Sequence, residues 1–236
     1  MSNSHHQPTY ARHRYPKEII AYAVWLYHRF CLSYRDVEDL LAERGVIVSY
    51  ETIRRWCIKF GHAYARRIRR NRGQIGDKWH LDEVFVTISG KRSYLYRAID
   101  QYGNILDILL LRRRNRDAVL SFLRKLRSTY QRRPRVIITD KLRSYQAALR
   151  SIFSGVEHRQ HKGLNNRIEA SHRRTRKRQR FMQQFPSRAS AQRFLSAFEF
   201  IQDFTCPKRH LSTASAYRSQ RDERYEQWSY LTDLAT

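Results

Sequence analysis

Three acidic residues stand at positions where a carboxylate is unusual unless it has a chemical role. Asp82 interrupts one apolar, strand-like run, and Asp140 directly follows another. Glu169 is the only acidic residue from Arg159 through Arg180, a stretch that holds nine Lys or Arg. Carboxylate oxygens are the ligands that hard divalent cations prefer. The three residues are therefore predicted to form a metal site in basic surroundings.

The charge balance indicates what such a site would act on. The 236 residues include 47 Lys+Arg and 21 Asp+Glu, a net charge of 47 − 21 = +26. A well-solvated basic surface is the alternative, but so large and clustered an excess favours binding to a nucleic acid. With 41% hydrophobic and 13% aromatic residues the chain can form a core. No run of 18 apolar residues occurs and no basic amphipathic anchor precedes a hydrophobic span, so neither a membrane span nor membrane-surface binding is expected. The polar start is not expected to be a signal peptide.

The cysteines and two neighbouring histidines argue against other metal or disulfide chemistry. Cys31, Cys57 and Cys206 are odd in number and widely spaced, so we expect reduced thiols in a cytoplasmic protein. His158 and His161 are close together, but nothing nearby completes a tetrahedral zinc set. Polar contacts near a site or a phosphate are the favoured interpretation of this pair, and zinc is the alternative.

The N-terminal part has the layout of a helix-turn-helix. Pro16 opens an apolar-periodic stretch that reaches Phe30 and predicts a first helix. Ser33 is a plausible N-cap of a second helix, Gly45 suits the break after it, and Ser49 can cap a third. Such an arrangement is typical of DNA-binding proteins. A three-helix bundle with a solvated basic face is the alternative.

The third predicted helix presents polar and basic side chains, and a positive stripe extends beyond it. Early side chains of such a helix can reach base edges, while basic ones also contact phosphates. The residues expected to contact DNA here are Tyr50, Thr52, Arg54, Arg55, Lys59, Arg66, Arg67, Arg69 and Arg70.

From Lys78 onward the pattern changes to that of a mixed α/β domain. Strands are predicted at 79–89, 93–100, 105–111, 135–139 and 156–160, and helices at 116–130, 142–153, 163–180 and 187–204. This order is that of a ribonuclease-H-like sheet. The predicted organisation is a flexible N-terminus (1–14), an all-α helix-turn-helix domain with linker (15–76), a catalytic α/β domain (77–205) and a tail (206–236) that suggests a docking or dimer-contact segment.

Eight short segments between Tyr15 and Phe204 then occur in the order and placement found in one family. They are Ser33 to Arg35, Leu41 to Val46, Thr52 to Trp56, Trp79 to Glu83, Tyr94 to Asp100, Thr139 to Lys141, Val156 to Gln160 and Asn165 to Glu169. In these segments the chain resembles the DDE transposases of prokaryotic insertion sequences, in the family conventionally numbered six. The resemblance implies a ribonuclease-H-like catalytic core.

The resemblance also assigns Asp82, Asp140 and Glu169 as the catalytic, metal-binding triad. Only 28 residues separate Asp140 from Glu169, fewer than the family leads one to expect. A shortened loop near 151–155 would account for the difference, since loops tolerate deletions.

Strand transfer breaks one phosphodiester bond and makes another, with water or a DNA 3′-hydroxyl as nucleophile. Two Mg²⁺ ions about 3.5–4 Å apart, or Mn²⁺ as a substitute, can activate the attacking oxygen and stabilise the leaving one. We expect Asp82 to bridge both ions, Asp140 to hold one and Glu169 the other. Glu83 should face the opposite side of its strand, and Asp100 and Asp107 are expected to be solvated residues at strand ends or turns.

Basic residues close to the triad are expected to hold DNA phosphates. Arg173 and Arg176 share the helical face of Glu169, and Lys141 follows Asp140 directly. Lys177 and Arg178 point elsewhere on that helix, where they are expected to follow another segment of DNA.

The sequence thus predicts a transposase that binds the terminal inverted repeats of its element and cleaves and joins double-stranded DNA. A homodimer or higher assembly is expected, because two ends must join one target, and a cytoplasmic, nucleoid-associated location follows. The family resemblance implies a replicative route. Two alternatives stay open: a helix-turn-helix regulator, and a ribonuclease-H-like nuclease without end specificity.

Overall fold

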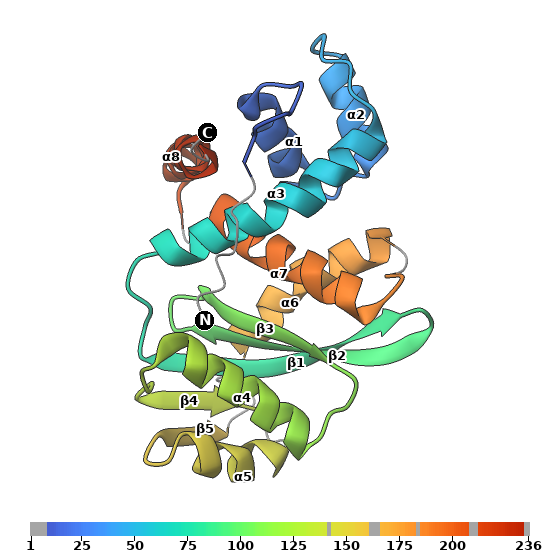
Figure 1. Ribbon diagram of the computed structural model, residues 1–236. Coiled ribbons are helices and arrows are strands. Elements are labelled where there is room, and N and C mark those ends of the chain that lie inside the picture. The colour runs from blue at the N-terminus through green and yellow to red at the C-terminus, as the bar shows by residue number, and fades with distance from the viewer. Residues whose placement is uncertain (1–8, 141–142, 161–165, 183–184, 208–211, 234–236) are drawn as a thin grey trace. The chain divides into compact units, whose positions relative to one another are not determined.

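A five-stranded mixed sheet organises residues 73–195, one of two units in the computed structural model of the chain. The other unit combines residues 1–72 with residues 196–236. The structure describes residues 9–140, 143–160, 166–182, 185–207 and 212–233 (Figure 1). Every helix in these ranges is too short or too polar to cross a bilayer.

The sheet combines an antiparallel meander with two parallel strands. β1 (Lys78–Ile88), β2 (Lys91–Asp100) and β3 (Ile105–Leu111) form the meander, and β4 (Val136–Thr139) and β5 (Glu157–Gln160) continue the sheet in parallel from β1. The strand order β3-β2-β1-β4-β5 leaves β1 in the centre. The strands predicted from the sequence are confirmed with shifts of one or two residues at their ends.

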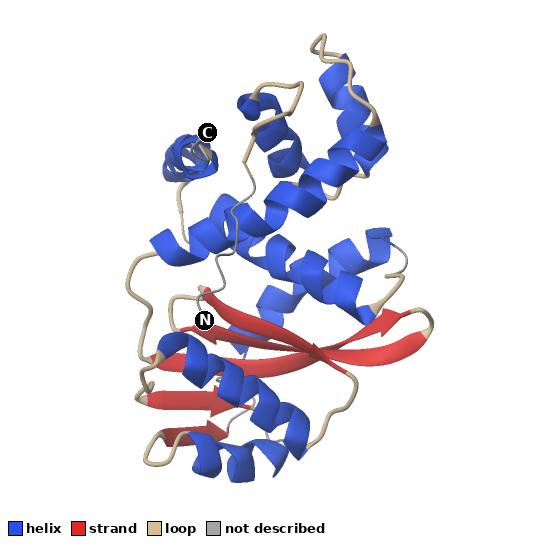
Figure 2. Ribbon diagram, viewed as in Figure 1, coloured by secondary structure: helices blue, strands red, loops and turns tan. Residues whose placement is uncertain are grey.

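Helices cover both faces of this sheet (Figure 2). α4 (Arg116–Tyr130) and α5 (Arg143–Ile152) pack on one face, where they share a core with β1. α6 (Asn166–Met182) and the first part of α7 (Arg188–Thr205) lie on the other face. Only residues 153–156 join α5 to β5, consistent with the short loop expected there.

Strand alternation in β1 decides which face each side chain reaches. Trp79 and Leu81 are fully buried in the core beneath α4 and α5, together with Phe122. Asp82 is one residue further along, so it faces the opposite layer, which contains α6. The next residue, Glu83, returns to the α4 and α5 face.

Local capping signals set the helices of the other unit. α1 (Lys17–Arg29), α2 (Tyr34–Ala42) and α3 (Tyr50–Asn71) begin at the positions predicted from Pro16, Ser33 and Ser49. Ser33 forms a capping box with the residue at the third helical position, and Ser49 accepts a hydrogen bond from the backbone N–H of Thr52.

The connection between α2 and α3 spans positions 43–49. A compact helix-turn-helix has a turn of about three to four residues, so this connection is longer. Gly45 has a φ of 74°, in the left-handed region that glycine adopts without steric cost.

The C-terminal part differs most from the predicted organisation. α8 (Ala214–Thr232) packs in the helical unit instead of forming a separate tail. Trp228 is 1% exposed, its ring lies 5.3 Å from Trp25 and 5.1 Å from Tyr64, and its indole N–H donates to the Ala21 carbonyl oxygen. The second part of α7, from Ser196, also belongs to the helical unit, although the sequence pattern assigned residues up to 205 to the α/β domain.

Two carboxylates that were predicted to be solvated are buried. Asp100 is 0% exposed and accepts hydrogen bonds from the backbone N–H groups of Tyr102, Asn104 and Gly76 at 2.8–3.2 Å. Asp107 is 2% exposed and pairs with Lys125 at 2.9 Å. The prediction was wrong because both carboxylates find donors within the fold that the sequence pattern does not reveal.

Candidate active site

The register between β1 and β4 brings two of the predicted catalytic residues together. In this parallel pair Lys78 is level with Val136 and His80 with Ile138. Continuing the same register by two residues places Asp82 level with Asp140, just beyond the end of β4. Within the described part of the chain, Asp82, Glu83 and Asp140 each offer a carboxylate oxygen, and these oxygens lie within 4.8 Å of one another.

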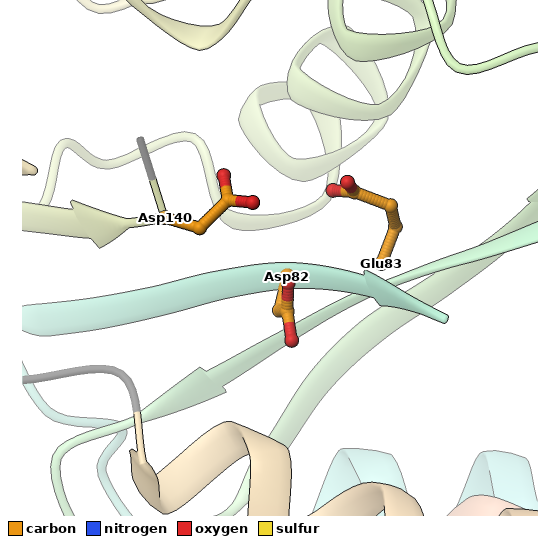
Figure 3. Close-up of side chains that lie close together, drawn as sticks. All are labelled: Asp82, Glu83 and Asp140. Atoms are coloured by element: carbon orange, nitrogen blue, oxygen red, sulfur yellow. The ribbon is translucent and has the colours of Figure 1, made fainter. Parts of the chain in front are cut away.

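The three carboxylates, here called the acidic cluster, approach from both sides of β1. Figure 3 shows Glu83 and Asp140 pointing toward each other on one side, while Asp82 projects from the other side of the strand. The expectation that Glu83 turns away from Asp82 is therefore confirmed.

Asp82 is held by groups of the α6 layer. Its side chain is 14% exposed, and Nε2 of His172 lies 3.1 Å from its Oδ2. Arg97 is the cross-strand partner of Asp82 and is 2% exposed. Burial lowers the pKa of His172 below 6.5, assisted by the charges of Arg97 and Arg176 and opposed by the bond to Asp82. Near neutral pH the uncharged imidazole therefore donates its Nε2–H to the carboxylate.

The guanidinium of Arg114 contacts both Glu83 and Asp140. Arg114 donates from Nε to Oε1 of Glu83, and its Nη2 lies 3.2 Å from Oδ2 of Asp140. The hydroxyl of Tyr145 donates to Oε2 of Glu83 at 2.8 Å. Burial raises the pKa of Glu83, and the hydrogen bonds from Tyr145 and Arg114 offset part of that rise.

Glu169 belongs to α6, but its side chain lies outside the described part of the structure. Position 169 is one helical turn before His172, so the two positions lie on neighbouring parts of the helix surface. Lys141, another predicted site residue, is also outside the described residues.

The basic residues of α6 divide into exposed and buried ones. Arg173, Arg176 and Lys177 are exposed, as DNA contact requires. Arg178 is 1% exposed, and its guanidinium lies 5.7 Å from the ring centre of Phe181 and 5.6 Å from that of Phe194. The prediction that Arg178 follows DNA was wrong, because its guanidinium is enclosed between helices of its own unit.

Most of the residues expected to contact DNA on α3 are accessible. The exposed ones are Tyr50, Arg54, Arg55, Lys59, Arg66 and Arg70, while Thr52, Arg67 and Arg69 are partly exposed.

Several of these side chains already have partners within the helical unit. Glu51 accepts hydrogen bonds from Arg54 and Arg55, which hold its pKa at about 2. Arg67 donates to the Asp233 carbonyl oxygen at 2.8 Å, and Arg69 stacks over Phe200.

Sequence patterns did not single out Arg114 or Tyr145. Arg114 is the last of three consecutive arginines that join β3 to α4, and nothing in their spacing distinguishes it. His158, by contrast, was expected to make a polar contact, and its Nε2 lies 2.9 Å from Oγ1 of Thr139 at the end of β4. Its neighbour His161 lies outside the described residues.

The lowered pKa of His172 predicts a specific loss of stability in acid. A group whose pKa is depressed by folding stabilises the folded state above its unfolded pKa, here 6.5, and that contribution is lost as the pH falls through the folded pKa. The free energy of unfolding should therefore decline less steeply below pH 6.5 in His172→Gln than in the natural protein. Denaturant titrations across this range test the prediction, and parallel curves would contradict it.

Comparisons with known proteins place the chain in a family. A family model described as a DDE domain matches residues 76–207. The transposase of insertion sequence-like element IS431mec from Staphylococcus aureus is 35% identical over 165 residues, which cover 68% of this chain and 73% of the relative. The Staphylococcus aureus transposase of element IS257 in transposon Tn4003 is 34% identical over 165 residues, which again cover 68% of this chain and 73% of the relative.

Two solved catalytic domains resemble the chain more distantly. The integrase catalytic core domain of HTLV-2, in complex with magnesium, is 16% identical with a TM-score of 0.40, over 63% of this chain and 98% of that one. The catalytic domain of the Mos1 mariner transposase is 13% identical with a TM-score of 0.39, over 76% of this chain and 95% of that domain.

The sheet order and the helices on both faces define a ribonuclease-H-like α/β domain, as predicted. The acidic cluster lies at its central strand, and an all-α unit accompanies it. The chain belongs to the DDE transposases of insertion sequences, enzymes that cleave DNA and transfer its strands. The family resemblance noted in the sequence is thereby confirmed.

Proposed function

We propose that this transposase binds the terminal inverted repeats of its element through residues 15–76. Metal-dependent cleavage and strand transfer would then take place at Asp82, Asp140 and Glu169. The observation that carries the proposal is the meeting of Asp82 and Asp140 at the centre of the sheet, with carboxylate oxygens within 4.8 Å. Carboxylates this close repel one another unless cations or protons compensate their charges.

The donor set fits a hard divalent cation. All the ligand atoms are carboxylate oxygens, which suit Mg²⁺, with Mn²⁺ as a substitute. Both oxygens of Glu83 already accept hydrogen bonds, from Arg114 and Tyr145. We therefore assign the third ligand position to Glu169, whose place on α6 is one turn from the His172 that contacts Asp82.

Two cations bound at these residues would activate the attacking oxygen and stabilise the leaving oxygen of the phosphodiester. The chain's own residues supply the positioning. His172 fixes the orientation of Asp82. Arg173 and Arg176 are exposed on the neighbouring part of α6, where they can hold phosphate oxygens through charge-assisted hydrogen bonds.

The start of α3 is the proposed reader of the element ends. Tyr50, Arg54 and Arg55 are exposed there, and Lys59 follows two turns on. The first turns of a recognition helix reach base edges in the major groove. Glu51 stays ionised, since its pKa is about 2, and it orders the guanidinium of Arg54 before contact with DNA.

We propose that the enzyme works on DNA in the bacterial cytoplasm, associated with the nucleoid, as a homodimer or larger assembly.

A strand-transfer assay with duplex DNA of the element ends and Mg²⁺ tests the proposal. Glu169→Gln keeps the size of the side chain but removes the charge, so we expect joining to fall about a thousandfold, equivalent to about 4 kcal/mol of barrier. Duplex binding, measured by fluorescence anisotropy, should remain.

The matched control is Glu157→Gln, an exposed carboxylate on β5 that pairs with Arg159. It makes the same change in charge and should join DNA normally. Equal joining by Glu169→Gln and the natural protein would remove Glu169 from the site. Equal cleavage of scrambled ends would instead favour a nuclease without end specificity, and binding without any joining would favour a regulator.

A further inference from the structure

Arg114 contacts two carboxylates of the acidic cluster at once. Its Nε donates to Glu83, and its Nη2 lies 3.2 Å from Oδ2 of Asp140. A guanidinium is planar and rigid, so fixing Nε on one carboxylate also fixes the direction of the other nitrogens. The Arg114 side chain is 41% exposed, whereas that of Glu83 is 1% exposed. The buried carboxylate of Glu83 therefore holds a guanidinium that extends to the accessible end of the site.

Glu83 is in turn held by a hydrogen bond from a core residue. Tyr145 on α5 is fully buried, and its hydroxyl donates to the second oxygen of Glu83 at 2.8 Å. A continuous line of contacts therefore runs from α5 through Glu83 and Arg114 to Asp140. Asp140 follows the last residue of β4, so the ladder hydrogen bonds of the strand do not orient its side chain. The contact with Arg114 restrains it there.

We propose that Arg114 is a positioning residue for Asp140: anchored on Glu83, it orients the Asp140 carboxylate for a divalent cation. This inference rests on the proposed metal site. A carboxylate has about four lone-pair positions, so Asp140 can accept a hydrogen bond from Arg114 and bind a cation at the same time. Hydrogen-bond partners of metal ligands change metal affinity by about 10- to 100-fold when they are removed.

The opposite effect, in which Arg114 repels the cation, is the physical alternative. Arg114 and Glu83 form an ion pair, so together they carry no net charge. The electric field of such a pair falls off faster with distance than that of a single charge. Repulsion of the metal ion by Arg114 is therefore expected to be weaker than the benefit of orienting the Asp140 carboxylate. The contact also keeps Glu83 engaged, so that it does not replace Glu169 as a ligand.

Binding of Mn²⁺ to the full chain without DNA, measured by isothermal titration calorimetry, tests the inference. We expect Arg114→Gln to bind Mn²⁺ about 10- to 100-fold more weakly than the natural protein. Arg113→Gln is the matched control, because this exposed neighbour loses the same charge and should stay within about twofold. Arg114→Lys keeps the charge but cannot bridge two carboxylates as a fork, so its binding should remain weak.

A double-mutant cycle tests whether Glu83 affects Mn²⁺ binding through Arg114 or independently of it. If Glu83 acts through Arg114, the variant Glu83→Gln/Arg114→Gln binds Mn²⁺ no more weakly than Arg114→Gln alone. Unchanged or tighter binding in Arg114→Gln, or effects that multiply in the double variant, would overturn the inference. Should Arg114→Gln fail to fold, Arg114→Lys decides, because it leaves every carboxylate in place: weaker binding supports the inference and unchanged binding refutes it. If Asp140→Asn leaves Mn²⁺ binding intact, the proposed metal site itself is wrong.

Discussion

Replacing Asp82 or Asp140 with Asn is expected to lower DNA strand transfer about a thousandfold while leaving DNA binding intact. Asn keeps the shape of the side chain and one oxygen, but it loses the charge that a divalent cation requires. A metal contributes several kcal/mol of transition-state stabilisation, and about 4 kcal/mol corresponds to a thousandfold in rate. Both residues belong to the sheet unit, residues 73–195, so neither change should disturb the helical unit. Joining of labelled element-end DNA under single-turnover conditions measures the effect.

The matched control is Asp117→Asn. Asp117 is an exposed carboxylate in the first turn of α4, and its replacement makes the same change in charge outside the acidic cluster. Its strand-transfer rate should stay close to that of the natural protein. A rate for Asp82→Asn or Asp140→Asn similar to that of the control would exclude these residues from catalysis.

Trp228→Ala is expected to destabilise the helical unit by about 3–5 kcal/mol. Trp228 is 1% exposed and contacts the rings of Trp25 and Tyr64, so its removal leaves a large cavity and removes the hydrogen bond to the Ala21 carbonyl oxygen. That loss is comparable to the total stability of many small domains. Chemical denaturation followed by circular dichroism should show the helical transition moved to lower denaturant.

Tyr230→Ala serves as its control on the same helix. Tyr230 is 77% exposed, so its replacement removes an aromatic ring without opening a cavity and should change stability by less than about 0.5 kcal/mol. Equal stability of Trp228→Ala and Tyr230→Ala would mean that α8 does not depend on this anchor.

The elements that local chemistry determines could be predicted from the sequence. Ser33 and Ser49 cap the helices expected after them, and Gly45 adopts the positive φ expected of a residue following a helix. The period-two pattern of β1 also placed Asp82 and Glu83 on opposite faces. These features depend on residues within a few positions of one another.

Features that depend on distant partners could not be predicted. α8 buries little besides Trp228, Leu231 and Thr232, so its sequence carries only a weak helical pattern. Asp100 was expected to be solvated and Arg178 to follow a segment of DNA, and both expectations place the charge at the surface, where charged residues usually lie. Both are buried: Asp100 accepts a hydrogen bond from the backbone N–H of Gly76, 24 residues before it, and Arg178 lies beside the ring of Phe194 on the next helix.

The candidate site shows the same division. Asp82 and Asp140 could be identified because each interrupts or ends an apolar strand, where a carboxylate has few structural reasons to occur. Arg114 and Tyr145 could not, because one is a member of an arginine run and the other resembles an ordinary core aromatic. Their importance follows only from the folded contacts with Glu83.

Anomalous scattering from Mn²⁺ in crystals of the transposase bound to element-end DNA tests the central claim most directly. We expect two peaks about 3.5–4 Å apart, with Asp82 between them, Asp140 at one and Glu169 at the other. Peaks elsewhere, or a metal held by Glu83 while Glu169 points away, would contradict it.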